Sequence, residues 1–110
     1  MSKYLRDKEL IDSKAKVFKA LSHPSRLFMV EELSKGEKCV CEFVDEIKAD
    51  FSTISKHLSI LKEAGIIKSE KRGKWVYYHL SLTCVTGFVV CLGESLIENV
   101  EMKAELFNKN

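Results

Sequence analysis

The sequence predicts a mostly helical fold with one small β-hairpin, in which a helix-turn-helix precedes the hairpin and a long helix follows it. Three observations lead to this prediction. The stretch from Asp50 to Gly65 has the ends and the apolar spacing of a short helix. After Gly65 the apolar pattern changes from helical to alternating, as in paired strands. From Ser81 onward a broad apolar stripe returns at helical spacing.

Length and composition restrict the class of protein. The chain has 110 residues, which predicts a single domain over residues 1–110. Charged residues make up 31% and hydrophobic ones 45%, the values of a soluble globular chain. The sequence has no apolar run of membrane-spanning length and no signal peptide, so we expect a cytoplasmic protein without a membrane partner. It also has no catalytic carboxylate pair, nucleophile motif or phosphate loop, so we expect no enzyme and no required cofactor.

The N-terminal part predicts an arm and two helices. Residues 1–9 are charged and are expected to form a frayed arm. Apolar residues from Leu10 to Leu21 then predict a first helix. Pro24 suits the first turn of a second helix, and Gly36 suits its end.

Residues 40–65 are predicted to form the helix-turn-helix. A short helix ends near Lys48, and a tight turn leads into the helix that begins at Asp50. The polar face of this second helix carries groups that suit phosphates and base edges in the DNA major groove. The candidate DNA contacts there are Ser52, Thr53, Ser55, Lys56 and His57. Two alternatives stay open: the face is merely solvated, and His57 holds the turn by a hydrogen bond.

Residues 66–80 are predicted to form a basic hairpin. Gly73 suits the turn, because a glycine accepts the positive φ that tight hairpin turns need. Alternation places Val76, Tyr78 and Leu80 on the face toward the core. The net charge is only +2, but basic residues crowd the turn, and we expect Lys71, Arg72 and Lys74 to contact DNA phosphates or the minor groove. The alternative is a solvated hairpin tip.

Residues 82–106 are predicted to form the last helix. Its apolar stripe is broader than one chain of this size can cover, so we expect a homodimer through the terminal helices.

This order of elements is that of a winged helix, and the chain resembles the arsenic-sensing branch of the ArsR/SmtB family of metal-sensing bacterial repressors. The matching pieces are A-L-S-H-P-S-R-L, K-C-V-C-E-F, T-I-S-K-H-L-S-I-L-K-E-A-G-I-I and R-G-K-W-V-Y-Y-H-L, which together cover most of residues 15–81. The resemblance implies a homodimer that binds double-stranded operator DNA. It also implies release from DNA by As(III) or Sb(III), with another soft thiophilic metal ion as the alternative inducer.

The resemblance also implies that Cys39 and Cys41 ligate the ion. The chain departs from the pattern at Val44, where the best-known arsenic sensors have a third cysteine. We expect Cys84 or Cys91 to supply the third sulfur, from the same or the other subunit, and prefer Cys84 because it lies at the start of its helix. For each of these two, apolar packing is an equal alternative. The last helix has no His, so the zinc site of other family members looks absent.

The spacing of Cys39 and Cys41 sets a geometric condition. Within a helix their side chains would point ~200° apart, whereas in extended backbone they share a side. We therefore expect Cys39–Cys41 to be non-helical when an ion is bound, so that binding competes with the helix start. Without an ion the two are alternatively small buried hydrophobes.

A competing function on the same fold is a thiol-redox or persulfide-sensing repressor. It needs Cys39 or Cys41 to reach Cys84 or Cys91. The close spacing of Cys39 and Cys41 favours ion binding instead, since a disulfide between residues i and i+2 is strained.

Overall fold

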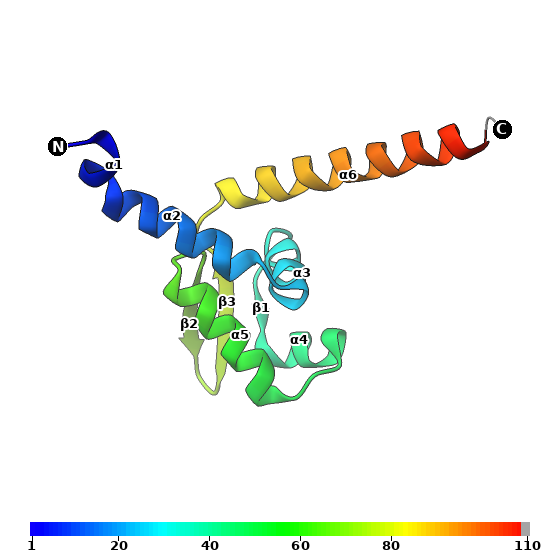
Figure 1. Ribbon diagram of the computed structural model, residues 1–110. Coiled ribbons are helices and arrows are strands. Elements are labelled where there is room, and N and C mark those ends of the chain that lie inside the picture. The colour runs from blue at the N-terminus through cyan, green and yellow to red at the C-terminus, as the bar shows by residue number, and fades with distance from the viewer. Residues whose placement is uncertain (109–110) are drawn as a thin grey trace.

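The computed structural model describes the backbone of residues 1–108 and the side chains of residues 1–104 (Figure 1). The helices are α1 (Lys3–Arg6), α2 (Lys8–Leu21), α3 (Pro24–Leu33), α4 (Val40–Ile47), α5 (Phe51–Glu63) and α6 (Cys84–Asn108). The strands are β1 (Lys38–Cys39), β2 (Ile67–Arg72) and β3 (Trp75–Leu80). The winged helix-turn-helix predicted from the sequence is confirmed.

The core joins the helix-turn-helix to the sheet. Phe43 of α4, Ile54, Leu58 and Leu61 of α5, and Ile66 before β2 are all fully buried. The stripe predicted on the second helix of the motif is therefore its inner face, and Ser52, Thr53 and Lys56 are exposed on the outer face. This packing fixes α5 on the body of the domain.

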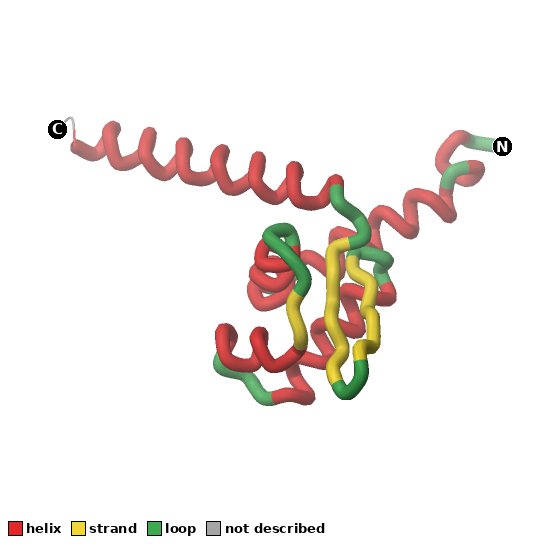
Figure 2. Tube along the Cα trace, turned by 180° about the vertical axis from the view of Figure 1, so that it is seen from behind, coloured by secondary structure: helices red, strands yellow, loops and turns green. Residues whose placement is uncertain are grey.

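The sheet has three strands in the order β1-β3-β2 (Figure 2). The predicted hairpin is present as β2 and β3, with Gly73 at a φ of +63° in the turn. The third strand, β1, was missed: Lys38 pairs with Tyr78 and Cys39 with Tyr77. A strand of two residues is too short to show an alternating pattern, so only the pairing across the fold reveals it.

The arm predicted over residues 1–9 contains the short helix α1 and the start of α2. Helix α1 is capped by Ser2, whose Oγ accepts a hydrogen bond from the backbone N–H of Leu5 at 3.3 Å. Helix α2 then begins at Lys8, two residues before the predicted start. Cap residues and charged helix formers suffice to extend the helix where apolar periodicity is lacking.

Helix α6 projects from the body of the domain as a long arm (Figure 1). It begins at Cys84 rather than at residue 82 and continues past residue 106 to Asn108. Val85 and Val89 are buried against the core, whereas the apolar residues farther along are exposed, including Leu92, Leu96, Ile97 and Val100. Among the described helices, none has the length and apolar character needed to cross a bilayer.

Candidate nucleic-acid interface and thiol site

Helix α5 presents most of the predicted DNA contacts on one outward face. Asp50 caps the helix, and its Oδ1 accepts a hydrogen bond from the backbone N–H of Thr53 at 2.8 Å. Hydrogen bonds from Thr53 hold the pKa of the Asp50 carboxyl below its usual value, which keeps the cap ionised. Ser52, Thr53 and Lys56 are exposed, and Ser55 is half-buried. The face is free to meet a groove of DNA.

His57 is turned from this face toward α3. Its Nδ1 lies 3.1 Å from Nη1 of Arg26, and its ring centroid lies 4.5 Å from that of His23. Because a guanidinium only donates, Nδ1 of His57 accepts this hydrogen bond. Burial, and then His23, lower the pKa of the His57 imidazole, so it stays neutral near pH 7. This geometry supports the structural alternative for His57, with Arg26 anchored in turn on the carbonyl of Ala20 at 2.6 Å.

The tip of the β2–β3 hairpin carries two uncommitted cations. Lys71 and Lys74 are exposed and, like Lys56, form no ion pair within the described part of the chain. These three are therefore available to phosphates.

Arg72 differs from the neighbouring lysines, because carboxylates already hold its guanidinium. Nη1 and Nη2 bind the two carboxylate oxygens of Glu37 at 2.6 and 2.9 Å, and Nη2 also binds Glu70 at 2.9 Å. The guanidinium lies over the ring of Tyr77. The Arg72 hydrogen bonds lower the pKa values of both carboxyl groups. Arg72 thus fastens the hairpin to the segment before β1, and a phosphate contact would compete with these ion pairs.

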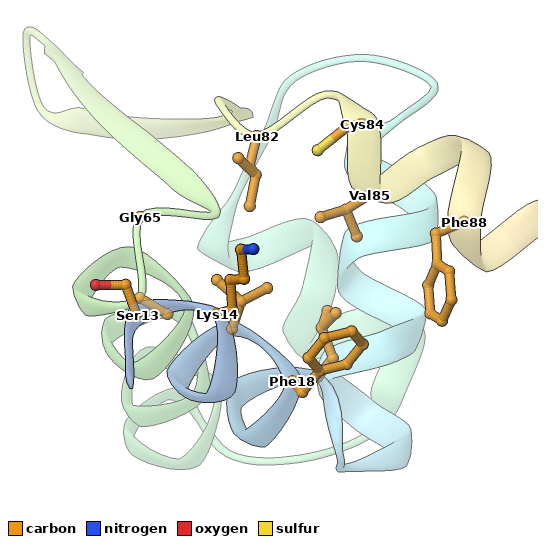
Figure 3. Close-up of a pocket in the computed structure, with 11 residues that line it drawn as sticks. Ser13, Lys14, Phe18, Gly65, Leu82, Cys84, Val85 and Phe88 are labelled. Carbon is orange, nitrogen blue, oxygen red and sulfur yellow. The ribbon is translucent and has the colours of Figure 1, made fainter. Parts of the chain in front are cut away.

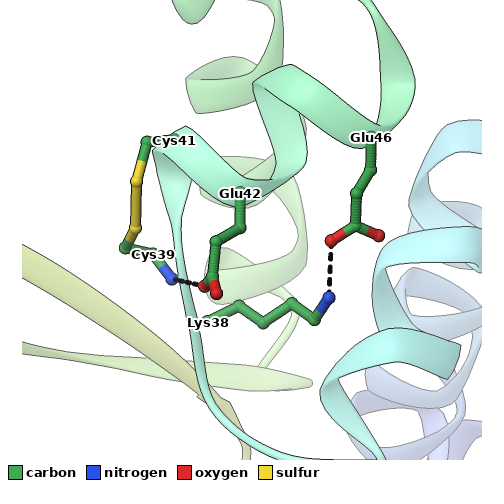
Figure 4. The surroundings of a disulfide bond; sticks show 5 residues. All are labelled: Lys38, Cys39, Cys41, Glu42 and Glu46. Atoms are coloured by element: carbon green, nitrogen blue, oxygen red, sulfur yellow. Dashed lines mark hydrogen bonds and ion pairs between the residues drawn. A yellow bond between two sulfur atoms is a disulfide. The ribbon is translucent and has the colours of Figure 1, made fainter.

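The segment that carries the cysteine pair is tethered at successive residues. Glu37 is held by Arg72, and Nζ of Lys38 reaches Glu46 at 2.5 Å and Glu32 at 3.5 Å. The backbone N–H of Cys39 donates to the carboxylate of Glu42 at 2.8 Å (Figure 4). The position of Cys39 is therefore set by α3, α4 and the hairpin together.

The sulfurs of Cys39 and Cys41 converge and are joined as a disulfide (Figure 4). Cys39 is extended, with φ −95° and ψ 167°, whereas Cys41 already lies inside α4. In this disulfide form the single extended residue Cys39 brings the two side chains together, and the non-helical conformation expected when an ion is bound stays a prediction. The sequence argument favoured ion binding over a Cys39–Cys41 disulfide, and the structure shows the pair in its disulfide form. The reduced form of the same pair has two adjacent thiols.

A cavity of about 250 Å³ adjoins the two cysteines. Its wall contains Ser55 of α5 and Lys74 of the hairpin turn, two of the predicted DNA contacts. The remaining wall is mostly apolar and includes Phe51, Trp75 and Tyr78, which the sequence reasoning did not assign to a site. In the sequence, the large aromatic residue Trp75 beside the basic turn was the signal that could have indicated this cavity. The thiol site and the DNA-facing elements thus share one cavity.

The structure does not bring Cys84 or Cys91 to this site. Both are exposed on α6, and no group of three or more His, Cys, Asp or Glu suited to a metal ion occurs among the described residues. Cys84 instead lines a separate apolar cavity of about 460 Å³ between α2 and the start of α6 (Figure 3). Phe18 and Phe88 meet there edge to face, with centroids 5.8 Å apart. Val44, at the position of the expected third cysteine, packs against the core.

Sequence comparisons place the chain among transcriptional regulators. Residues 23–69 match the model of the bacterial regulatory proteins of the arsR family. An uncharacterized HTH-type transcriptional regulator of Methanocaldococcus jannaschii is 44% identical over 73 residues, covering 66% of this chain and 82% of the relative. The arsenical resistance operon repressor of Bacillus subtilis is 37% identical, covering 74% and 78%. A cadmium resistance regulatory protein homologue of Staphylococcus aureus is 49% identical, but this chain spans only 55% of its length.

Solved structures agree with this placement. The homodimeric winged helix-turn-helix DNA-binding domain Mb0332 of Mycobacterium bovis superposes with a TM-score of 0.80 at 25% identity and covers 93% of both chains. The transcriptional repressor BigR of Xylella fastidiosa gives a TM-score of 0.68 at 32% identity, covering 84% of this chain and 93% of that one. Relatives and fold are those of DNA-binding regulators rather than enzymes, as the sequence predicts.

Proposed function

The chain belongs to the ArsR/SmtB family of DNA-binding transcriptional regulators, and from this premise we propose that it is a homodimeric, cytoplasmic repressor that As(III) or Sb(III) releases from operator DNA. The inducer binds the thiolates of Cys39 and Cys41. The name of the Bacillus relative supports a metalloid, and that of the Staphylococcus relative keeps a soft divalent ion as the alternative.

DNA binding uses α5 and the hairpin. Ser52, Thr53 and Ser55 meet base edges in the major groove, while Lys56, Lys71 and Lys74 meet phosphates. The outward position of these residues and the absence of ion pairs on the three lysines, within the described part of the chain, support this division of roles. A homodimer would then occupy an inverted repeat with half-sites ~10 bp, or a multiple of that, apart.

The homodimer is supported by the uncovered apolar face of α6. Leu96, Ile97 and Val100 are each more than half exposed in one subunit. A second copy of the same helix face is the partner that closes such a surface in a symmetric pair.

Inducer binding is a ligand exchange without a change of oxidation state. Arsenous acid and the two thiols form two As–S bonds and break two As–O bonds, and two waters leave with the thiol protons. The convergence of the two side chains supports a shared ion, because soft thiolates are the ligands that such ions prefer. The disulfide form must first be reduced.

The cavity beside the cysteine pair is the observation that supports an effect of the inducer on DNA binding. Ser55 and Lys74 line the same cavity as Cys39 and Cys41. Once the disulfide has been reduced, a bridging ion holds the two sulfurs farther apart than the S–S bond does, so the start of α4 and the cavity wall must adjust. The ion thereby biases the placement of α5 relative to the hairpin, and both must fit DNA at once.

The test is an arsenite titration of the reduced protein on fluorescent operator DNA, with anisotropy as the readout. We expect Cys39→Ser and Cys41→Ser to bind DNA as the wild type does but to keep it at arsenite concentrations that release the wild type. Ser keeps the size of the side chain and removes the soft ligand. Cys91→Ser is the control for loss of a thiol elsewhere. Full release in Cys39→Ser would refute metalloid sensing at this pair.

A second candidate is a thiol-redox repressor. The sequence suggests a disulfide that joins Cys39 or Cys41 to Cys84 or Cys91, but the described structure keeps these pairs apart. The Cys39–Cys41 disulfide favours a version in which this pair is itself the switch. DNA binding of the oxidised and reduced protein without any metalloid tests it: a large difference, abolished by Cys41→Ser, is the expected sign.

A further inference from the structure

The cavity between α2 and the start of α6 has the dimensions of a small-molecule site (Figure 3). Its volume is about 460 Å³, inside the range of roughly 300–1,000 Å³ that such sites span. It shares no lining residue with the cavity beside the cysteine pair. Phe18 and Phe88 are 58% and 50% exposed, so large apolar side chains surround an opening that solvent can reach. The apolar wall includes Val17, Phe18, Leu21, Leu82, Val85 and Phe88.

Lys14 is the single charged residue among the described residues of this wall. Figure 3 shows its side chain reaching from α2 toward Leu82. Its helix offers it no carboxylate, because the residues three and four positions away are all apolar, namely Leu10, Ile11, Val17 and Phe18. Within the described part of the chain Lys14 forms no ion pair. A cation that interrupts an apolar stripe without a counterion is a place for an anionic group of a ligand.

We propose that this cavity binds a medium-chain monocarboxylate. The carboxylate pairs with Nζ of Lys14, and the alkyl chain lies against Phe18, Val85 and Phe88. The volume suits such a chain: an apolar cavity of about 150 Å³ holds one benzene molecule, and the cavity here is roughly three times as large. A chain of about eight carbons is therefore the size that this space accommodates.

The polar groups of the wall favour a ligand with one anionic group. Ser13 is the other polar residue from α2, and its hydroxyl already donates a hydrogen bond to the carbonyl of Glu9 at 3.0 Å. The thiol of Cys84 is only a weak donor. A dicarboxylate or a phosphate ester would leave negative charge without a partner beside apolar side chains, which is costly.

The experiment titrates the full-length protein with butanoate, hexanoate, octanoate and octanol by calorimetry. We expect the affinity for the carboxylates to rise about fourfold for each added CH₂ group, because each one removes further apolar surface from water. Lys14→Gln should weaken octanoate binding by at least about tenfold, the loss of one charge-assisted hydrogen bond, and should leave octanol binding unchanged. Lys16→Gln, which removes a lysine of α2 that lines a different cavity, is the matched control.

The two free cysteines of α6 give an independent readout. Cys84 and Cys91 are both exposed, but only Cys84 lines this cavity. Octanoate should therefore slow the alkylation of Cys84 by iodoacetamide several-fold, as followed by mass spectrometry of the peptides, and leave Cys91 unaffected. The protection should disappear in Lys14→Gln.

The outcomes also separate this inference from the proposed function. An affinity that does not depend on chain length, or octanoate binding that survives Lys14→Gln, overturns the carboxylate site. If no carboxylate binds and Cys84 resists alkylation without ligand, a second copy of the chain covers the cavity, and the inference is equally overturned. Cys39→Ser should bind octanoate as the wild type does, so the loss of arsenite response and the loss of carboxylate binding are distinguishable.

Discussion

The two regions that carry cysteines differ in how completely one subunit covers them. Cys39 is only 9% exposed, and Glu42 and the tethers of Lys38 fix the segment around it. Cys84 and Cys91 are exposed on α6, whose apolar residues beyond Val89 are also uncovered. One subunit contains all of the site around Cys39 and Cys41, whereas the apolar surface of α6 needs a second copy to cover it.

This difference separates the roles that the two regions can take. A site whose geometry is fixed inside one subunit can hold a ligand between side chains at a defined distance. A shift of those side chains on binding then moves the neighbouring elements. Residues on a surface that a second subunit covers can act in this way only after the dimer has formed.

The largest effect is expected at the uncovered part of α6. Leu96→Glu or Ile97→Glu places a charge in the proposed subunit interface, so we expect monomers or aggregates and loss of operator binding. Analytical ultracentrifugation measures the state, and anisotropy measures DNA binding. Glu98→Gln, a polar change on the same helix, is the control. Stable dimers in both glutamate variants would place the interface elsewhere.

A second effect concerns the third sulfur around inorganic arsenite. Since Cys84 and Cys91 do not join the pair within the described part of one subunit, we expect either of them to act only from the partner subunit, with Cys84 preferred. X-ray absorption of the arsenite complex should then show fewer sulfur neighbours in Cys84→Ser than in the wild type. Unchanged sulfur counts in Cys84→Ser and Cys91→Ser would give the third position to hydroxide or a small thiol.

A smaller effect distinguishes the basic residues of the hairpin. Lys74→Ala should lower the slope of log affinity against log salt by about one, the effect of one lost phosphate contact. Arg72→Ala should lower that slope less, because Glu37 and Glu70 already hold its guanidinium. Lys103→Ala removes the same charge from α6 and serves as the control. A full unit of slope lost in Arg72→Ala would restore Arg72 as a phosphate contact.

The smallest effect is a pH dependence at His57. Burial lowers the pKa of its imidazole in the folded protein, so the unfolded chain binds the proton more readily. The stability contributed by neutral His57 is complete above its ordinary pKa and is lost as the pH falls below that value. Urea unfolding between about pH 7.5 and 5.5 should therefore weaken the wild type more steeply than His57→Gln. Parallel curves would show that His57 does not couple protons to folding.

The sequence was sufficient for the helix-turn-helix, the hairpin and the last helix because their signals are local. The Asp50 cap, the stripe of Ile54, Leu58 and Leu61, and Gly73 each act within a few residues, so they define α5 and the hairpin turn directly. The apolar excess of the last helix likewise follows from composition alone. The sequence did not indicate helix α1, because this helix is capped by Ser2 and has no apolar stripe.

The tertiary structure alone decided how the site is assembled. Strand β1 exists because Lys38 and Cys39 pair with β3, and the extended Cys39 is what turns its sulfur back toward Cys41. Three contacts join residues that lie far apart in the chain. Glu37 binds the guanidinium of Arg72, and His57 accepts a hydrogen bond from Arg26. Phe51 and Trp75 line the same cavity. Residue types and periodicity specify which groups a segment offers, but contacts between distant segments depend on packing, and these contacts determine which of those groups are free to act.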